Sequence, residues 1–177
     1  MKESIGNTYL VLMALTLISI IAALLVASFI YSKTYKIKNR IINIIEKHNG
    51  EIKTLDKNDE TIKDIYRELG RMGYKVLYQD ETCPDFNTYR DEMTEEGEAF
   101  VASDNIFELV HDRKNGNYDF CLYRVKTPNY DDSTSTKPKM YYYHLITYTH
   151  YDIPIFEQFI KIPITGDTRT YGIQVGG

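Results

Sequence analysis

The sequence predicts an α+β protein in which a long N-terminal helix, half transmembrane and half amphipathic, packs on a small antiparallel β-sheet head with one further helix. A charge-free stretch near the N-terminus is followed by apolar positions that repeat every three or four residues. From residue 105 onward, short β-branched and aromatic runs alternate with turn signals. The expected parts are a short flank (1–8), a transmembrane helix (9–31), an amphipathic extension (32–49) and the head domain (50–177).

The composition narrows the class of protein. The chain has 177 residues, 43% of them hydrophobic and 26% charged, so most of it is expected to fold. The 25 acidic residues outnumber the 21 basic ones, which argues against a nucleic-acid-binding protein that relies on positive charge. Only two cysteines are present, which excludes a disulfide-dense mini-protein and a four-cysteine zinc module.

The stretch from Tyr9 to Tyr31 contains no charged residue. As a helix it would extend roughly 35 Å, enough to cross a bilayer core of about 30 Å. Aromatic residues stand near both of its ends, where rings favour the membrane interface. The alternative is a cleaved signal peptide, but the apolar run exceeds the usual length of about 7–15 residues and no clean A-x-A site follows it. We therefore expect a retained span whose first partner is the lipid bilayer.

The charges around this span give two answers about its orientation. Four cations follow the span before the first acid: Lys33, Lys36, Lys38 and Arg40. Because Lys2 on the other side is offset by Glu3, the positive-inside rule places the head in the cytoplasm. From Ile41 onward, however, 16 basic residues stand against 24 acidic ones, and the two cysteines suit an oxidising exterior. We expect an extracytoplasmic head, with the flanking charges opposing that assignment.

The helix is expected to continue past the membrane as an amphipathic segment. No proline or glycine occurs between Asn7 and Asn49, and the apolar positions that follow the span form one stripe. These positions are Tyr35, Ile37, Ile41, Ile42, Ile44 and Ile45. Asn49 and Gly50 supply a C-terminal stop, with Lys47 and His48 in the last turn. The stripe must be buried, most simply against the head.

A second helix is expected early in the head. Asn58 or Asp59 can cap it, Glu60 stands in its first turn, and Gly70 and Gly73 end it. Its inner face would consist of Ile62, Ile65, Tyr66, Leu69 and Met72. A short strand at 74–78, a polar loop at 83–85 and an acidic turn region at 93–97 are expected to follow.

The rest of the chain is expected to form antiparallel strands at 105–111, 118–126 and 139–152. The first two flank Asn115-Gly116, a strong hairpin signal because both residues tolerate positive φ. A polar loop precedes the third strand, and Ile153-Pro154-Ile155 breaks it. A last pair of strands, 160–164 and 168–173, is expected around a turn at Thr165-Gly166-Asp167.

The two cysteines allow three interpretations. Cys83 falls in a predicted loop and Cys121 in a predicted strand. They can form a disulfide, remain free thiols or, with a histidine, make a nucleophilic pair. No motif surrounds either residue, so catalysis is the least favoured, and a disulfide is the most favoured if the head lies outside. Its closed loop would stabilise the head by roughly 3–4 kcal/mol through loop entropy.

No catalytic residue, metal or cofactor is predicted. The strand at 139–152 would place His144, His150 and Asp152 on one face because its side chains alternate, but an exposed tyrosine-rich strand explains them as well as a metal site would. The run Asp56–Glu60 resembles a calcium loop but lacks its glycine and final glutamate, so a helix cap is preferred. The sequence contains no P-loop, GxSxG or HExxH motif.

The start Gly6-Asn7-Thr8-Tyr9-Leu10-Val11 leads into a charge-free span, an amphipathic half and a small α+β head with a cysteine pair. In outline, over the whole chain, this arrangement resembles the type IV pilins and pseudopilins, including the TadE-like minor pilins. Pilins carry a glutamate five residues after the glycine at which they are cleaved. Counted from Gly6, that position is Val11, a departure that bears on processing after Gly6 and on the salt bridge that the glutamate makes with a neighbouring subunit.

The resemblance implies assembly rather than chemistry. The apolar segment would pack beside the helices of like or related pilin-type subunits, and small residues would let the backbones approach closely. These helix-packing candidates are Ala14, Ser19, Ala22, Ala23 and Ala27, although a generic anchor explains them equally well. Two other classes stay open: a membrane-anchored extracytoplasmic binding or sensor module that is not part of a filament and, last, a membrane-tethered enzyme.

Overall fold

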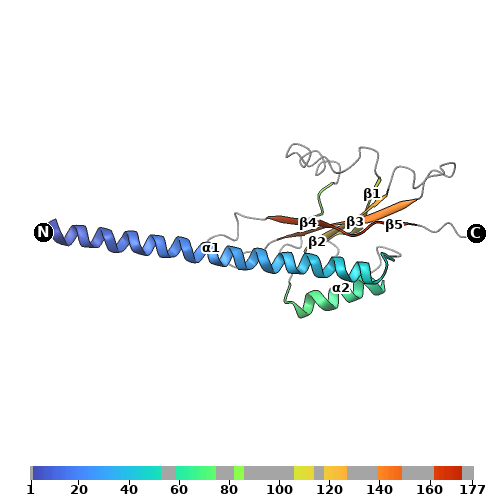
Figure 1. Cartoon of the computed structure of the whole chain (residues 1–177), viewed down its shortest axis with the longest axis horizontal. Coiled ribbons are helices and arrows are strands. Elements are labelled where there is room, and N and C mark those ends of the chain that lie inside the picture. The colour runs from blue at the N-terminus through green and yellow to red at the C-terminus, as the bar shows by residue number, and fades with distance from the viewer. Residues whose placement is uncertain are drawn as a thin grey trace, which may run out of the picture.

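A computed structural model describes residues 2–52, 59–74, 82–85, 106–113, 118–126, 139–148 and 162–172, except for the side chains of residues 2–7 and 106. Its elements are α1 (Lys2–Lys47), α2 (Glu60–Arg71), β1 (Ile106–His111), β2 (Phe120–Lys126), β3 (Met140–Tyr148), β4 (Pro163–Asp167) and β5 (Tyr171–Gly172). The first half of α1 projects alone, and its second half lies with α2 against the sheet (Figure 1). The predicted α+β class, with a long helix, a further helix and a small antiparallel sheet, is confirmed.

α1 is a single helix of 46 residues, longer than the sequence predicts at its N-terminal end. Its described side chains are largely exposed as far as Phe29, and burial begins at Thr34, which is 3% exposed. Ile37, Ile41 and Ile45 follow on the same face and are 1%, 0% and 0% exposed. The predicted apolar stripe is therefore confirmed as the surface that α1 buries against the head.

The end of α1 is fixed by its last turn. Asn49 and Gly50 adopt left-handed conformations, with φ of 53° and 70°. The Gly50 N–H donates to the Ile45 carbonyl at 2.9 Å, and the Asn49 N–H donates to the Glu46 carbonyl at 3.1 Å. This is the Schellman arrangement, which satisfies carbonyls that the helix leaves open. The predicted stop at Asn49-Gly50 is confirmed.

α2 begins at the predicted cap and returns along α1 in the opposite direction. The Asp59 carboxylate accepts from the Thr61 N–H at 2.9 Å and from the Ile62 N–H at 3.3 Å, as an N-cap does. Its predicted inner face is confirmed: Ile62, Ile65 and Leu69 are buried, and Tyr66 and Met72 pack against them. Asp64 contacts His48 while Glu68 contacts Arg40, so α2 runs back toward the projecting half of α1.

The sheet is antiparallel in the order β1-β2-β3-β4, and β5 also pairs with β3. In the register of the central pair, Phe120 lies opposite Thr147 and Lys126 opposite Tyr141. The predicted strand at 139–152 is confirmed as β3 as far as Tyr148, and residues 149–152 lie outside the described residues. Residues 75–78 of the predicted strand at 74–78, the Asn115-Gly116 turn and the acidic region at 93–97 also lie outside them.

One prediction about the sheet is wrong. Thr165-Gly166-Asp167 is not a turn between paired strands; it lies within β4. β4 and β5 do not pair with each other, because both pair with β3, one after the other along the same edge. Between them the Thr168 N–H donates to the Tyr143 carbonyl at 3.0 Å, and the Tyr143 N–H donates to the Thr168 hydroxyl at 3.0 Å. The ladder therefore continues through side-chain bonding where the backbone leaves the strand.

The main core lies between the two helices and one face of the sheet. Its buried members include Ile37, Ile41, Ile45, Ile62, Ile65, Leu69, Phe120, Leu122, Tyr143 and Leu145. Because side chains alternate along a strand, the intervening residues form a second buried cluster on the opposite face. That cluster contains Cys121, Tyr123, Ile146 and Tyr148.

We predict that Gly50→Ala destabilises the head by clearly more than Gly73→Ala. Both glycines have positive φ, +70° and +64°, so alanine is strained at each by about 1–2 kcal/mol. A Cβ at Gly50 would lie 2.6 Å from the Tyr171 ring, whereas no atom of the described residues lies within 4 Å of one at Gly73. Urea unfolding of the full-length protein in detergent measures both. Equal losses would show that the Tyr171 ring moves aside without cost.

Candidate functional site

The projecting half of α1 is long and apolar enough to cross a membrane. Its most apolar window of 18 residues has a mean hydropathy of 2.9, and 0% of that window is buried. Two hydroxyl groups in it donate back to the helix, from Thr16 to the Met13 carbonyl and from Ser19 to the Leu15 carbonyl, each at 2.9 Å. Because both hydroxyl protons are satisfied within the helix, Thr16 and Ser19 can enter hydrocarbon at a lower cost than unpaired hydroxyls would.

The predicted small residues of α1 do not share one face. At about 100° per residue, Ser19, Ala23 and Ala27 follow one another at steps of four, in line with Thr34 and the buried isoleucine stripe. Ala14 lies on the opposite side of the helix, and Ala22 lies about a quarter turn away. A helix packed on the Ser19–Ala27 row would therefore lie on the side of α1 that carries the head.

The sheet approaches α1 closely at Gly166 in β4. A Cβ built there would lie 2.9 Å from Cδ of Lys38 and 3.0 Å from Cδ1 of Ile42. Gly166 therefore lies where helix and strand approach closely rather than in a turn, and a larger residue would have to displace the ends of the Lys38 and Ile42 side chains. Further along, the Arg169 N–H donates to the Glu46 carboxylate at 3.0 Å and its guanidinium donates to the Asn49 amide oxygen at 3.0 Å. These contacts fix the direction of β4 relative to α1.

The chain that leaves α1 is held by polar side chains of the sheet. The Tyr143 and Tyr141 hydroxyls donate to the Gly50 carbonyl at 2.8 and 3.3 Å. Arg124 donates to the Ile52 carbonyl and to the Tyr143 hydroxyl. Burial raises the pKa of Tyr143 to about 12, although the nearby Arg124 charge acts in the opposite direction.

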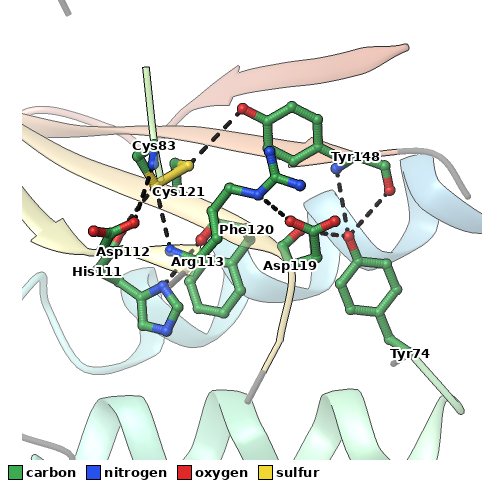
Figure 2. Close-up of polar contacts among 9 residues, drawn as sticks. All are labelled: Tyr74, Cys83, His111, Asp112, Arg113, Asp119, Phe120, Cys121 and Tyr148. Carbon is green, nitrogen blue, oxygen red and sulfur yellow. Dashed lines mark hydrogen bonds and ion pairs between the residues drawn. A yellow bond between two sulfur atoms is a disulfide. The ribbon is translucent and has the colours of Figure 1, made fainter. Parts of the chain in front are cut away.

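Cys83 and Cys121 are joined by a disulfide, with Cα atoms 5.8 Å apart. The Cys83 N–H also donates to the Asp112 carboxylate at 3.0 Å (Figure 2). The Tyr123 hydroxyl donates to the Pro84 carbonyl at 2.6 Å. Segment 82–85 is thus fastened to β2 and to Asp112 by a covalent bond and by hydrogen bonds, and neither sulfur is a free thiol.

A buried ion pair lies beside this disulfide. Arg113 donates through Nε to Asp119, and their side chains are 4% and 0% exposed. The Arg113 guanidinium lies 3.9 Å from the centroid of the Tyr148 ring (Figure 2). The Tyr74 hydroxyl lies 2.7 Å from the Asp119 carbonyl and 3.1 Å from the Tyr148 carbonyl, and burial raises its pKa well above the ordinary value. The cluster therefore neutralises its charges internally and ties three separate segments together.

His111 is buried in a fixed tautomer. Its Nδ1 lies 3.0 Å from the Phe120 carbonyl, which can only accept, so Nδ1 carries the proton. Its Nε2 then accepts from the Tyr66 hydroxyl at 2.8 Å. The ring also stacks on Phe120 with centroids 3.9 Å apart. Both nitrogens are engaged within the fold, so His111 does not pair with either cysteine.

The structure places His144 next to Asp167, with 2.6 Å between Nδ1 and Oδ1. His150 and Asp152, the other two residues considered for a metal, lie outside the described residues. Within the described residues no group of three or more His, Cys, Asp or Glu side chains could hold a metal ion.

A polar cleft of about 380 Å³ lies between α1 and α2. Its charged lining residues are Arg40, Lys47, Arg67, Arg71, Asp64 and Glu68. The two acids are already ion-paired, Glu68 with Arg40 at 3.0 Å and with Arg71 at 3.5 Å, and Asp64 with Arg67 at 2.7 Å. Cations exceed acids by two in this cleft.

No protein-family model matches the sequence, and no match was found among curated proteins or among solved structures.

Sequence reasoning did not identify the Arg113–Asp119 pair or the Arg124 contacts. Single charged residues in or beside strands resemble solvent-facing positions, and only the fold brings Arg113 and Asp119 together at the base of the β1–β2 connection. Arg113 and Asp119 stand six residues apart, on either side of the predicted hairpin turn. This spacing is the one sequence signal from which the pair could have been predicted.

We predict that Asp119→Ala destabilises the head by about 3–5 kcal/mol, because it leaves the buried Arg113 charge without its counter-ion. The matched control is Glu108→Ala on the same sheet, whose carboxylate is 47% exposed and pairs with Arg124 and Lys126. That change should cost at most about 1 kcal/mol. Urea unfolding with the disulfide intact measures both, and similar losses would contradict a special role for the buried pair.

We predict that the tyrosinate absorbance lost on Tyr143→Phe titrates with a midpoint near 12. The folded state raises this pKa from 10.0 and therefore favours the neutral Tyr143 hydroxyl. The stability that this preference contributes is fully present below pH 10. About 3 kcal/mol of stability should be lost as the pH rises from 10 to 12. The wild-type minus variant difference spectrum near the tyrosinate band gives the midpoint, and a value near 10 would show that the hydroxyl is solvated.

Proposed function

We propose that this protein is a single-span, membrane-anchored and non-enzymatic subunit of pilin-like or pseudopilin-like type. It assembles through the apolar half of α1 and presents its β-rich head outside the cytoplasm. The observation that carries the proposal is the unbroken course of α1 from an exposed apolar half into a half that is buried against the sheet. Because the helix is continuous, the way its apolar half packs also sets the orientation of the head.

The row Ser19, Ala23 and Ala27 supports assembly through the helix. Small residues at steps of four allow two helices to approach closely in lipid, where packing rather than the hydrophobic effect drives association. The row continues the stripe that the head already covers beyond Thr34. A neighbouring helix on this row would therefore sit beneath the head, and contact between subunits would extend from the span to the head.

The polar groups of the head support a structural rather than a catalytic role. His111 uses both ring nitrogens within the fold, and the cysteines are consumed in a disulfide. Among the described residues, the buried charges Arg113 and Asp119 face each other. These groups therefore do not supply an activated nucleophile, which is one common basis of catalysis.

The disulfide supports an extracytoplasmic head. Disulfides form and persist in oxidising compartments and are rare where thiols are kept reduced. The acidic excess of the head does not favour a cytoplasmic head, because acidic residues contribute little to the positive-inside rule.

We predict that Ala23→Leu with Ala27→Leu reduces recovery of the protein in sheared surface filaments by about tenfold, because the larger side chains separate the helices. Ala14→Leu, the same change on the opposite side of α1, should leave recovery unchanged. An intact disulfide in each variant shows that the head has folded. Wild-type protein that is never recovered with filaments, but is accessible to protease on intact cells, would instead identify an anchored binding or sensor module.

A further inference from the structure

The structure identifies which end of the head faces the membrane, if the span is inserted as proposed. α2 runs back along α1, with Glu68 beside Arg40, so Arg71 lies one turn closer to the span. Arg40 is nine residues past Tyr31, or about 13 Å at 1.5 Å per residue, which places Arg71 about 9 Å above the end of the span.

β4 reaches the same end from the other side of α1. Gly166 packs against Lys38 and Ile42, and Arg169 contacts Glu46, so β4 starts nearest the span (Figure 1). Ile162 precedes Gly166 by four residues, or about 13 Å of extended chain. This length of chain brings Ile162 toward the level of Tyr31, and its side chain is 37% exposed.

Among the described residues of α1 and α2, this end of the head is cationic, although the chain from Ile41 onward is acidic overall. Its basic residues, which we call the cationic base, are Lys33, Lys36, Lys38, Arg40 and Arg71. Lys33 and Lys36 are exposed, and the side chains of Arg40 and Arg71 are 54% and 71% exposed. The nearest acid in α2 is Glu68, which pairs with Arg40 and Arg71 and is 20% exposed. No acid occurs in α1 between Tyr31 and Glu46.

We propose that the cationic base docks the head on the anionic phospholipid headgroups of its own membrane. The headgroup layer extends about 5–7 Å beyond the hydrocarbon, and surface potential acts over about 8–10 Å, so Lys33, Lys36 and Arg71 lie within its range. Arginine binds phosphate through two parallel hydrogen bonds, and lysine binds it as a point charge. The acidic remainder of the head is repelled by the same surface, so the head is held upright on its basic end.

Docking also accounts for the flanking charges that opposed an exterior head. Lys33, Lys36, Lys38 and Arg40 act here as headgroup ligands, a role that does not depend on the side of the membrane. Arg71 belongs to the same surface although it is distant in sequence and plays no part in orienting the span. It is therefore the residue that separates docking from simple juxtamembrane charge.

The test reconstitutes the full-length protein into nanodiscs of phosphatidylcholine with a minor fraction of phosphatidylglycerol. Native mass spectrometry then counts the lipids that each protein molecule retains. We expect phosphatidylglycerol to be enriched over its share of the bilayer. Arg71→Gln should lower the enrichment about fivefold, the factor expected for one near-surface cation. Lys47→Gln, on α1 but about 24 Å beyond Tyr31, is the control and should leave the enrichment unchanged.

Three outcomes would overturn the inference. An enrichment that falls with Lys33→Gln and Lys36→Gln but not with Arg71→Gln would show that the head does not touch the lipid. Displacement of the lipid by inorganic phosphate alone would identify a small-anion site instead. A wild-type protein that enters nanodiscs but retains the two lipids in proportion to their abundance would contradict docking while leaving the anchor intact. Failure to enter nanodiscs would contradict the anchor itself, and filament recovery is a separate readout that none of these results decides.

Discussion

The burial of three isoleucines of α1 against the sheet is the contact on which the rest of this architecture depends. Ile37, Ile41 and Ile45 are almost fully buried, and each such side chain contributes about 1.5–3 kcal/mol when it leaves water. Gly166 lets β4 approach α1 closely enough to complete this contact. Because the same helix continues without a break into its apolar half, whatever holds that half also fixes the direction of the head.

The polar interactions of the head secure the places where regular structure ends. The carbonyls of Gly50 and Ile52, just past α1, accept from Tyr141, Tyr143 and Arg124. On the other face of the sheet, the disulfide fastens segment 82–85, and the buried Arg113–Asp119 pair joins the connection between β1 and β2 to Tyr148. A buried charge is tolerated only with its partner beside it, so these groups specify one arrangement of the connections.

The features that repeat along the chain were predictable, and those that depend on approach between distant segments were not. The 3–4 periodicity of α1 and the cap of α2 are local signals, and the structure confirms both. Thr165-Gly166-Asp167 has the composition of a turn, yet it forms part of β4 because it pairs with β3, and Gly166 faces Lys38 and Ile42 of α1 there. The same sequence pattern can therefore form a turn or part of a strand, and the elements packed beside it decide which.

The sequence by itself determined that a charge-free helix continues into an amphipathic one and that a sheet follows, because hydrophobic periodicity is set by the geometry of each element alone. It also supplied two cysteines, whose pairing depended on the fold that brings their Cα atoms to 5.8 Å. The tertiary structure alone decided that Arg113 meets Asp119 and that Arg71 returns toward the span. It also decided that Ser19, Ala23 and Ala27, but not Ala14, lie on the side of the head. These relations are set by how elements pack against one another, and packing depends on side chains that are far apart in the chain.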